Sequence, residues 1–412
     1  MKERKLLLTH YKQKEAAFLM ENNRLMHIWL SNSTKYNIGD IYVGRIKNMI
    51  KGMEAAFVEL APGQVGFLPF SSFNPKTVLN RSDAKEFKNG DEILVQVSKE
   101  PLKTKEMTLT TDVSFSGSYL VLIPFSHGIH YSKKFTKDEK LVMRQMISDA
   151  IVQLFGDMDV FLKHYGLIVR TNAFSAPEGA VAEELHDLFH KAGSVVSVAD
   201  KRRVFSCLYE EDSFYKRIVK NHFRRENTEI VTDDANVYKL LCTQTERLPE
   251  LSDTIRFYND AQITMYALYG LEEKIKEALS KKVWLSCGGY LIIEPTEALT
   301  VIDVNSGKTG KSQNKLSSEE FHHRVNCSAA PEIMRQIRLR NLSGIIIVDV
   351  LKTGTENSEK LLSMLKKEAL KDSVETVVVG MTALGLVEIT RKKTEASLYE
   401  KIKSEKEQEN ET

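Results

Sequence analysis

Two runs of mainly β-branched, apolar residues, each reaching an aspartate, stand out in the pattern of hydrophobic and polar positions along the chain. One run spans residues 298–307 and contains Asp303, and the other spans residues 344–350 and contains Asp349. Apolar runs of this length, broken by glycine, predict buried strands of a sheet. Because successive strand residues point to opposite faces, Asp303 and Asn305 are expected on the same side of their strand.

The acidic ends of these strands are the first candidates for chemistry. A carboxylate at the end of an apolar strand is costly unless it has a partner, and a divalent cation is the natural one. Either aspartate alone is explained equally well as a residue that caps the next turn. Two such strands with a helix between them favour a metal site shared by Asp303 and Asp349.

The stretch between the two strands predicts a helical crossover. Ser317 and Glu320 form a capping-box pattern, and residues 319–340 read largely as helix. Pro331 interrupts this pattern and is expected to begin a second helical segment. A strand–helix–strand unit places two parallel strands side by side, which supports the shared site.

Arg335 and Arg338 lie three residues apart, and therefore on one face of the predicted helix. One interpretation is a basic face exposed to solvent. Next to a carboxylate pair, a clamp for the phosphate groups of a ligand is favoured.

Nearer the N-terminus the periodicity is that of short strands. Residues 16–21 and 24–30 flank an Asn22-Asn23 turn, which predicts a hairpin. Residues 37–112 contain short alternating strands separated by glycine and proline, a pattern typical of a small closed β-barrel.

One strand of this barrel region carries an aromatic side chain opposite its apolar face. Ala56, Val58 and Leu60 fall on one face, and Phe57 falls on the other. An aromatic on the polar face of an OB-type barrel suggests a platform for stacking bases, which Phe67 would extend. The structural alternative is that either phenylalanine plugs the mouth of the barrel.

Composition narrows the class of protein. A chain of 412 residues is too long for one core and suggests about two to four domains. It has 58 basic and 56 acidic residues, so nucleic-acid binding would rely on local patches. The run Leu6–Leu8 is too short for a signal peptide, and no stretch is long enough to span a membrane. Its cysteines form no C-x-x-C pair, which indicates a reduced cytoplasmic protein without a thiolate zinc site: Cys207, Cys242, Cys287 and Cys327.

The motifs around the aspartates, TEALTVIDVNSGK and EIMRQIRLRNLSGIIIVDV, resemble the catalytic region of the RNase E/G family of bacterial endoribonucleases. Two further segments resemble the same family: YGLEEKIKEALSKKVWLSCGGYLIIEPTEALT and IYVGRIKNMIKGMEAAFVELAPGQVGFLPF. The similarity extends from Lys5 to about Arg391.

This resemblance implies roles for the residues already singled out. Asp303 and Asp349 would hold Mg²⁺, and Asn305 would orient the metal ligand or the scissile phosphate. Three residues of the barrel region would contact RNA: Phe57, Phe67 and Lys105.

The segment after the barrel resembles the family's pocket for the 5′ end of RNA, in the pieces GSYLVLIP, SKK and GLIVRT. The residues implied for this pocket are Gly117, Val121, Lys133, Arg170 and Thr171. A terminal monophosphate needs a cation and hydroxyl or backbone donors, which Arg170 and Thr171 would supply. An ordinary surface role for Arg170 is the alternative. Lys133 stands where the family usually has arginine, so it keeps the charge but loses the bidentate fork.

The resemblance also implies the architecture, an α/β multidomain protein. An RNase H-like scaffold would carry an inserted OB-type RNA-binding barrel and a 5′-sensor region, and a DNase I-like α/β catalytic domain would follow. The expected bounds are 1–36 and 215–281 for the two parts of the scaffold, 37–112 for the barrel, 113–214 for the sensor region, 282–400 for the catalytic domain and 401–412 for a charged tail.

The sequence departs from the family pattern in two places. Lys352 stands where the family commonly has a second acid after Asp349, which makes the local field more positive. The family's C-P-x-C zinc link has no counterpart after Cys327. We therefore expect a monomer, or a homodimer held without zinc.

The resulting expectation is a cytoplasmic, Mg²⁺-dependent endoribonuclease of rRNA processing or mRNA decay. It would cut single-stranded RNA to leave a 5′-phosphate and a 3′-hydroxyl, with a preference for 5′-monophosphorylated ends. The alternative is a catalytically inactive RNA-binding or ribosome-maturation factor of the same fold, which Lys352 and the missing zinc link favour.

Overall fold

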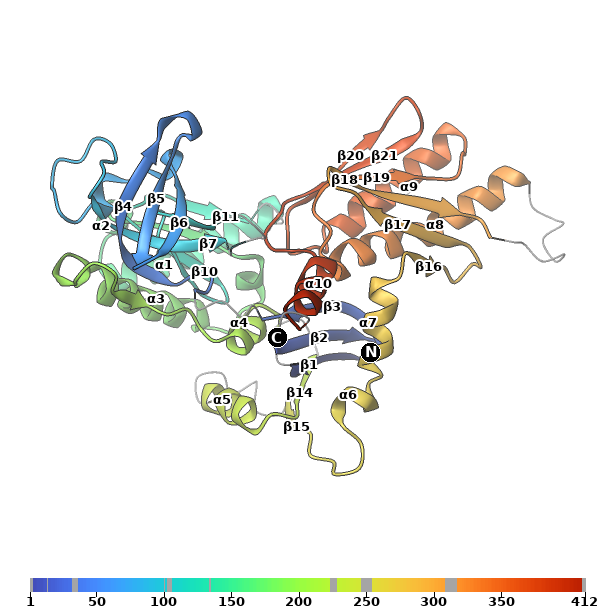
Figure 1. Cartoon of the computed structure of the whole chain (residues 1–412), viewed down its shortest axis with the longest axis horizontal. Coiled ribbons are helices and arrows are strands. Elements are labelled where there is room, and N and C mark those ends of the chain that lie inside the picture. The colour runs from blue at the N-terminus through green and yellow to red at the C-terminus, as the bar shows by residue number, and fades with distance from the viewer. Residues whose placement is uncertain are drawn as a thin grey trace. The chain divides into compact units, whose positions relative to one another are not determined.

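The described part of the chain is a mixed α/β protein with four sheets (Figure 1). The structure is a computed structural model and describes residues 3–12, 14–31, 36–99, 101, 106–132, 135–222, 228–245, 254–307 and 317–409. The chain divides into two compact units. Ser33–Arg224 form one, called here the inserted unit, and Met1–Asn32 with Arg225–Thr412 form the other, called here the discontinuous unit. The finer division into named subdomains stays a prediction.

The inserted unit begins with a closed five-stranded barrel. Its strands are β4 (Ile41–Ile50), β5 (Ala55–Ala61), β6 (Gln64–Pro69), β8 (Met107–Thr110) and β7 (Glu92–Lys99), and β7 pairs back onto β4. Short 3₁₀ turns interrupt it: η1 (Lys51–Met53), η2 (Phe70–Ser72) and η3 (Pro75–Thr77). A further strand, β13 (Cys207–Tyr209), pairs with the outer side of β4. The predicted alternation in β5 is confirmed, since Ala56, Val58 and Leu60 are buried and Phe57 is half-buried.

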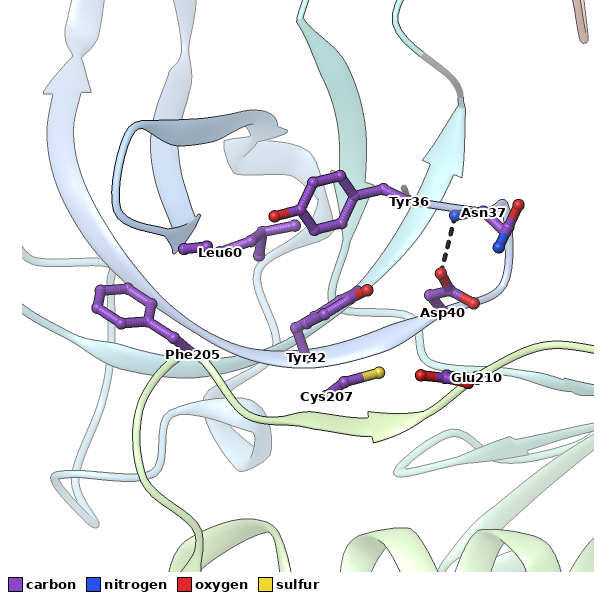
Figure 2. A pocket seen from close by; sticks show the side chains of 9 residues that line it. Tyr36, Asn37, Asp40, Tyr42, Leu60, Phe205, Cys207 and Glu210 are labelled. Atoms are coloured by element: carbon purple, nitrogen blue, oxygen red, sulfur yellow. Dashed lines mark hydrogen bonds between the residues drawn. The ribbon is translucent and has the colours of Figure 1, made fainter. Parts of the chain in front are cut away.

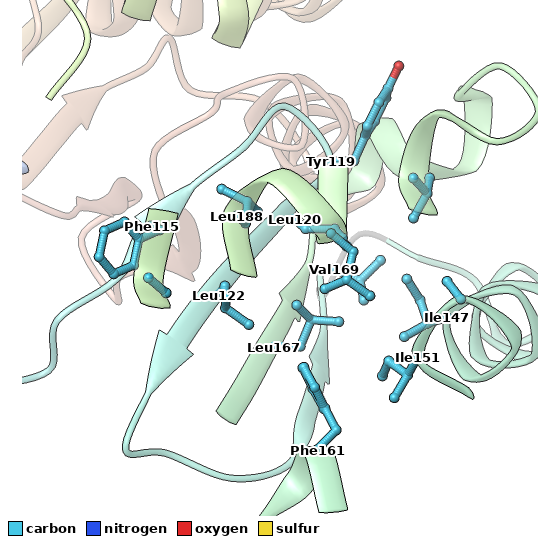
Figure 3. Close-up of a cluster of buried hydrophobic side chains, with 14 of the residues drawn as sticks. Phe115, Tyr119, Leu120, Leu122, Ile147, Ile151, Phe161, Leu167, Val169 and Leu188 are labelled. Carbon is cyan, nitrogen blue, oxygen red and sulfur yellow. The ribbon is translucent and has the colours of Figure 1, made fainter. Parts of the chain in front are cut away.

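A four-stranded sheet with helices completes the inserted unit. The strand order is β11 (Ile129–Tyr131), β12 (Tyr165–Val169), β10 (Leu120–Pro124) and β9 (Phe115–Ser116). The other elements are α1 (Lys137–Phe155), α2 (Met158–Leu162), η4 (Thr171–Ser175), α3 (Ala180–Val196), η5 (Ala199–Lys201) and α4 (Phe214–His222). Leu122 and Leu167 from the sheet pack with Ile147 and Ile151 of α1 in one buried cluster (Figure 3). This core holds β10 and β12, and therefore the segments that flank Gly117 and Arg170, in fixed positions.

The first sheet of the discontinuous unit joins strands from distant parts of the sequence. Its order is β15 (Ile255–Phe257), β14 (Thr228–Thr232), β1 (Arg4–Tyr11), β2 (Lys14–Glu21) and β3 (Arg24–Leu30). The helices that follow in sequence are α5 (Ala235–Thr245), α6 (Met265–Leu268) and α7 (Leu271–Leu279). The predicted hairpin is confirmed, because Asn22 and Asn23 both have positive φ angles, of 48° and 61°, as the mirror-image turn between twisted strands requires.

The second sheet of this unit contains the two strands with aspartates. Its order is β16 (Lys282–Trp284), β17 (Tyr290–Pro295), β18 (Leu299–Asn305), β19 (Gly344–Asp349), β21 (Leu386–Arg391) and β20 (Thr376–Met381). The helices are α8 (Ser318–Leu339), α9 (Thr355–Ala369) and α10 (Leu398–Glu409). Ile302 and Val348 belong to the buried cluster that contains Val325 of α8 and Leu361 of α9. The alternate residues of β18 and β19 therefore face away from these helices.

The crossover helix differs from its prediction at one point. The capping box of Ser317 and Glu320 is confirmed, but α8 continues through Pro331 as one helix. The expectation of a second segment that begins at Pro331 was therefore wrong. A proline inside a helix loses one backbone hydrogen bond. Here Pro331 itself is exposed, while Ala330 and Ile333 are completely buried, so core packing holds the helix together across the proline. Within the described residues no helix combines the length and apolar character needed to cross a membrane.

Candidate active site

Asp303 and Asp349 lie side by side on neighbouring strands. β18 and β19 are parallel, as the crossover predicted, and their register pairs Asp303 directly with Asp349. In-register residues of adjacent strands point to the same face, about 4.8 Å apart along the sheet. The two carboxylates therefore share the open face, the one opposite the buried cluster under α8 and α9.

The surroundings of the pair suit a hard cation. Asp349 is exposed and Asp303 is half-buried, and the Asn305 side-chain amide donates to Asp303 Oδ2 at 2.7 Å. Among the described residues no three His, Cys, Asp or Glu side chains converge on one point, so a metal here would have two carboxylate ligands. That donor set fits Mg²⁺, which typically takes one or two carboxylates and keeps several waters or substrate oxygens.

Asn326 fixes the chain just beyond Asp349. Its buried amide donates to the Leu351 carbonyl at 2.7 Å, and its Oδ1 accepts from the Leu351 N–H at 3.1 Å. His322, one turn earlier on α8, donates from Nδ1 to the Lys352 carbonyl at 3.0 Å. Side chains of α8 thus form hydrogen bonds with the backbone directly after the end of β19. The sequence offered one signal for this role, a polar Asn326 beside the apolar Val325 in the crossover helix.

Arg335 and Arg338 make structural contacts. Arg335 forms an ion pair with the buried Glu332 and donates to the Leu25 carbonyl of β3. Arg338 lies against α9, where it donates to the Glu368 carbonyl at 3.4 Å, and burial lowers its pKa. The described contacts bring neither guanidinium group to the aspartate pair, so their role as a phosphate clamp stays a prediction.

Phe57 and Phe67 form a pair on the barrel. They are direct cross-strand partners in β5 and β6, and their ring centroids lie 6.1 Å apart in an edge-to-face arrangement. Both side chains are half-buried, so each keeps an accessible part of its ring. The pair therefore has the geometry of an aromatic platform. Lys105, the third residue expected to contact RNA, lies outside the described residues.

Glu184 of α3 occupies a backbone nest in the region expected to bind the 5′ end. Its carboxylate accepts from the N–H groups of Ser118, Tyr119 and Leu120 at 2.7, 2.6 and 2.8 Å. A side chain at Gly117 would meet Glu184 Oε1 at 2.2 Å and would push the carboxylate out of this nest. Sequence reasoning missed Glu184, since a glutamate on a helix gives no signal of a distant backbone partner.

Arg170 lies within the electrostatic influence of the same Glu184 carboxylate. Burial lowers the pKa of Arg170, and the charges of Glu184 and Glu211 oppose that shift. Arg170 also lines a cavity of about 290 Å³ together with Arg217 and Lys220. Serine and threonine residues contribute hydroxyl groups to the same cavity: Ser98, Thr110, Ser114 and Ser116. Asp112 and Glu211 line it as well, so a phosphate there would meet three cations and two carboxylates.

The remaining residues of the expected pocket are close in the fold but make other contacts. Thr171 donates from its hydroxyl to Ser132 Oγ at 3.1 Å. Val121 on β10 pairs with Ile168 on β12, two residues before Arg170. Lys133 lies outside the described residues.

A second cavity of the inserted unit, of about 300 Å³, has a different chemistry (Figure 2). The rings of Tyr36 and Tyr42 lie 5.4 Å apart beside it, and Phe205 adds a third aromatic side chain. Asp40 accepts at Oδ2 from the Asn37 N–H at 2.8 Å. Asp40 and Glu210 are among the described residues that line it, whereas lysine and arginine are not, so its lining is aromatic and acidic.

Comparison with known proteins identifies the family. A model described as the Ribonuclease E/G family matches residues 114–394. Ribonuclease G of Escherichia coli is 32% identical over 373 residues, which cover 88% of this chain and 74% of that protein. Ribonuclease G of Haemophilus influenzae is 32% identical over 393 residues, which cover 92% of this chain and 77% of that protein.

A longer relative aligns over a similar part of this chain. Ribonuclease E of Nostoc sp. is 32% identical over 374 residues, 89% of this chain, so the match spans about half of that protein, 52%. The family expected from the sequence motifs is thus confirmed by matches over most of the chain. By these matches, the chain belongs to the ribonuclease E/G family.

Proposed function

We propose that this chain is an Mg²⁺-dependent endoribonuclease that cuts single-stranded RNA to leave a 5′-phosphate and a 3′-hydroxyl. One observation carries the proposal: Asp303 and Asp349 are register partners on the open face of a sheet in a chain of this family. In this scheme the inserted barrel is the OB-type RNA-binding domain, and the sheet of β16–β21 is the DNase I-like catalytic domain. The first sheet is the RNase H-like scaffold.

The reaction needs a water to attack phosphorus while the bond from phosphorus to the 3′ oxygen breaks. Asp303 and Asp349 would hold the ion, which, when bound, lowers the pKa of a water and stabilises charge on the phosphodiester. Asn305 fixes the orientation of the Asp303 carboxylate through its 2.7 Å hydrogen bond. Asn326 fixes the chain that follows Asp349. The Asp303 carboxylate and the backbone that follows Asp349 are thus held in place before RNA arrives.

The other parts of the chain supply substrate binding. Phe57 and Phe67 would stack on unpaired bases, which would add affinity for RNA without a preference for particular bases. The cavity lined by Arg170, Arg217 and Lys220 would bind a 5′-monophosphate, which makes monophosphorylated RNA the preferred substrate. We place this activity in rRNA processing or mRNA decay in the cytoplasm.

The test is cleavage of a labelled single-stranded RNA by the parent protein and by Asp303→Asn and Asp349→Asn, in Mg²⁺ and in EDTA. We expect cleavage only by the parent, and only in Mg²⁺, while both variants bind the RNA as the parent does. The control is Glu294→Gln, because Glu294 lies at the exposed end of β17 in an ion pair with Lys281.

Cleavage by either variant within a few-fold of the parent would overturn the site. A parent that binds RNA but never cuts it would instead support the second candidate, a non-catalytic RNA-binding factor. The observation in favour of that candidate is Lys352, an exposed cation three residues after Asp349 where the family commonly has an acid.

A further inference from the structure

An aromatic pair lies on the open face beside the aspartates. Trp284 of β16 is 64% exposed, and its ring lies 5.4 Å from that of Tyr290 of β17 in an edge-to-face arrangement. The Lys282 ammonium lies 3.9 Å from the centroid of each ring. A tryptophan is a large apolar side chain, so this degree of exposure leaves a broad ring surface in water.

The register of the sheet connects this pair to the candidate active site. Trp284 pairs with Tyr290, and Tyr290 pairs with Asn305 on the next strand. In the neighbouring row, Lys282 pairs with Ile292, which pairs with Asp303. Paired residues point to the same face, so Trp284 lies two strand spacings from Asn305, about 10 Å. The aromatic pair and the aspartates thus form one continuous surface.

Two close backbone contacts fix the hairpin against the active-site strand. A side chain at Gly289 would meet the Asn305 carbonyl at 2.7 Å, and one at Gly307 would meet the Gly288 carbonyl at 2.4 Å. Within the hairpin, the Leu285 N–H donates to the Gly289 carbonyl at 2.8 Å. Because only glycine permits these approaches, the turn between β16 and β17 is held directly on the end of β18. Trp284 and Tyr290 therefore keep their position relative to Asn305.

The chemistry of this cluster matches a nucleotide. Unpaired bases stack on exposed aromatic rings, and a cation beside the rings attracts the backbone phosphates. Lys282, Trp284 and Tyr290 provide a cation and two rings on the same face.

We propose that Trp284, Tyr290 and Lys282 form a binding subsite for an unpaired nucleotide that flanks the scissile phosphate. The base stacks on the face of the Trp284 ring opposite Lys282, the Tyr290 ring supports the indole from the side, and Lys282 contacts an adjacent phosphate. This subsite rests on the proposed function, since it takes its meaning from cleavage at Asp303 and Asp349. It differs from the Phe57–Phe67 platform, which lies in the inserted unit.

The first test uses the intrinsic fluorescence of Trp284. The chain has two tryptophans, so a Trp29→Phe background makes Trp284 the single reporter. The protein also carries Asp303→Asn and Asp349→Asn, so that the RNA stays intact. We expect a single-stranded oligonucleotide to quench this fluorescence, and an oligonucleotide of abasic sugars to quench it far less. No quenching at RNA concentrations that saturate binding would overturn the proposal.

The second test uses cleavage by the otherwise unmodified protein. Trp284→Ala should lower kcat/KM on single-stranded RNA by roughly 5- to 150-fold, the range that one base stack is worth. Trp284→Phe keeps a ring and should retain most of the activity. The matched control, Trp29→Phe, should cut like the parent.

A scan with abasic sugars distinguishes a base-stacking role of Trp284 from a purely structural role. Abasic sugars are placed one at a time on both sides of the cleavage site. In the parent, one position should slow cleavage as much as Trp284→Ala does, and at that position the variant should show no further loss. Trp284→Gln, which also lacks a ring, takes the place of the alanine variant in this comparison if that variant folds poorly.

The outcomes separate this proposal from the one on which it rests. If the Asp303→Asn and Asp349→Asn proteins cut RNA normally, the proposed active site is wrong. If those proteins are inactive while Trp284→Ala cuts at the parental rate and no abasic position distinguishes the two, the active site stands and the subsite is wrong.

Discussion

At the scale of single residues, Phe57 and Phe67 are direct neighbours on adjacent strands. Their rings touch edge to face across β5 and β6, so each holds the other in place. A base that stacked on one ring would therefore meet a surface that both residues define.

We predict that Phe57→Ala and Phe67→Ala each weaken the binding of single-stranded RNA by about 1–3 kcal/mol, with little dependence on base identity. Because the rings are in contact, the double variant should lose less than the sum of the two. Fluorescence-anisotropy titrations measure these changes. Phe174→Ala is the control, since Phe174 is an exposed phenylalanine elsewhere in the inserted unit. Parental affinity in both variants, with an intact circular-dichroism spectrum, would return the two residues to a purely structural role.

Arg170 is the residue on which end preference should depend, because it lines the cavity with Arg217 and Lys220. We predict that the parent cuts a 5′-monophosphorylated RNA faster than the same RNA with a 5′-triphosphate or 5′-hydroxyl. Arg170→Ala should make the three rates equal, and Arg202→Ala, at an exposed arginine of the same unit, should leave the difference intact. Lysine in place of arginine at position 133 should make the preference smaller than is usual for the family. Equal rates on all three ends in the parent would mean that the cavity does not read the 5′ end.

At the scale of secondary-structure elements, one buried ion pair joins β21 to the loop before β20. Arg391 donates from Nε to Asp372 Oδ2 at 2.8 Å, and the two side chains are 0% and 1% exposed. Burial alone would raise the pKa of Asp372, but the hydrogen bond and charge of Arg391 outweigh it and hold that pKa below its usual value. Thr376 and the Val374 N–H also donate to the same carboxylate.

This pair should make the stability of the protein sensitive to acid. A depressed carboxylate pKa contributes stability above the unfolded value of about 3.9, and that contribution is lost as the pH falls through the lower folded value. We predict that Asp372→Asn costs about 3–5 kcal/mol at neutral pH, because it leaves a buried arginine unpaired. The variant should also show a flatter decline in stability below about pH 4. Urea titrations at several pH values measure both effects. Glu356→Gln, which breaks the exposed pair with Lys360, is the control and should cost less than about 1 kcal/mol. A cost for Asp372→Asn no larger than this control would contradict the argument.

Local patterns were sufficient to predict several elements and part of the site. Apolar, β-branched runs in residues 298–307 and 344–350 predicted β18 and β19, and a strand–helix–strand order predicted their parallel pairing. A capping box predicted the start of α8. These features depend on residues close in sequence, so periodicity and capping chemistry report them directly.

The contacts that sequence reasoning missed join residues far apart in the chain. Glu184 reaches backbone groups some 65 positions earlier, and Asn326 bonds Leu351 across the crossover. Pro331 suggested a break in α8, yet burial of the neighbouring residues keeps the helix whole. Such features depend on tertiary packing, which overrides local preference and leaves no trace in the local pattern.

At the scale of the whole molecule, the cysteines bear on assembly. All four lie among the described residues and none forms a disulfide, with Cys207 in the inserted unit and the other three in the discontinuous unit. Cys327 Sγ lies 3.5 Å from His323 Nε2, but no third ligand joins them among the described residues. A structural zinc site takes four ligands, usually cysteine or histidine.

We therefore predict that the 412-residue chain purifies without stoichiometric zinc, and that EDTA leaves its oligomeric state unchanged. Elemental analysis and light scattering before and after chelation measure this. Addition of zinc to the chelated protein is the matched control and should not change the mass. About one zinc per two chains, lost together with dimers on chelation, would contradict the prediction.

The pairing of β1 with β14 also has a consequence for folding during synthesis on the ribosome. β1 begins at Arg4, and its parallel partner begins at Thr228. At about 5–20 residues per second, a nascent chain emerges for roughly 10–45 s before the partner strand is made. Throughout that interval one edge of β1, with its fully buried Leu6, Leu7 and Leu8, has no neighbour from its own chain. Translation speed across the inserted unit is therefore a factor in how much of this protein reaches the native state, and how much is lost to aggregation.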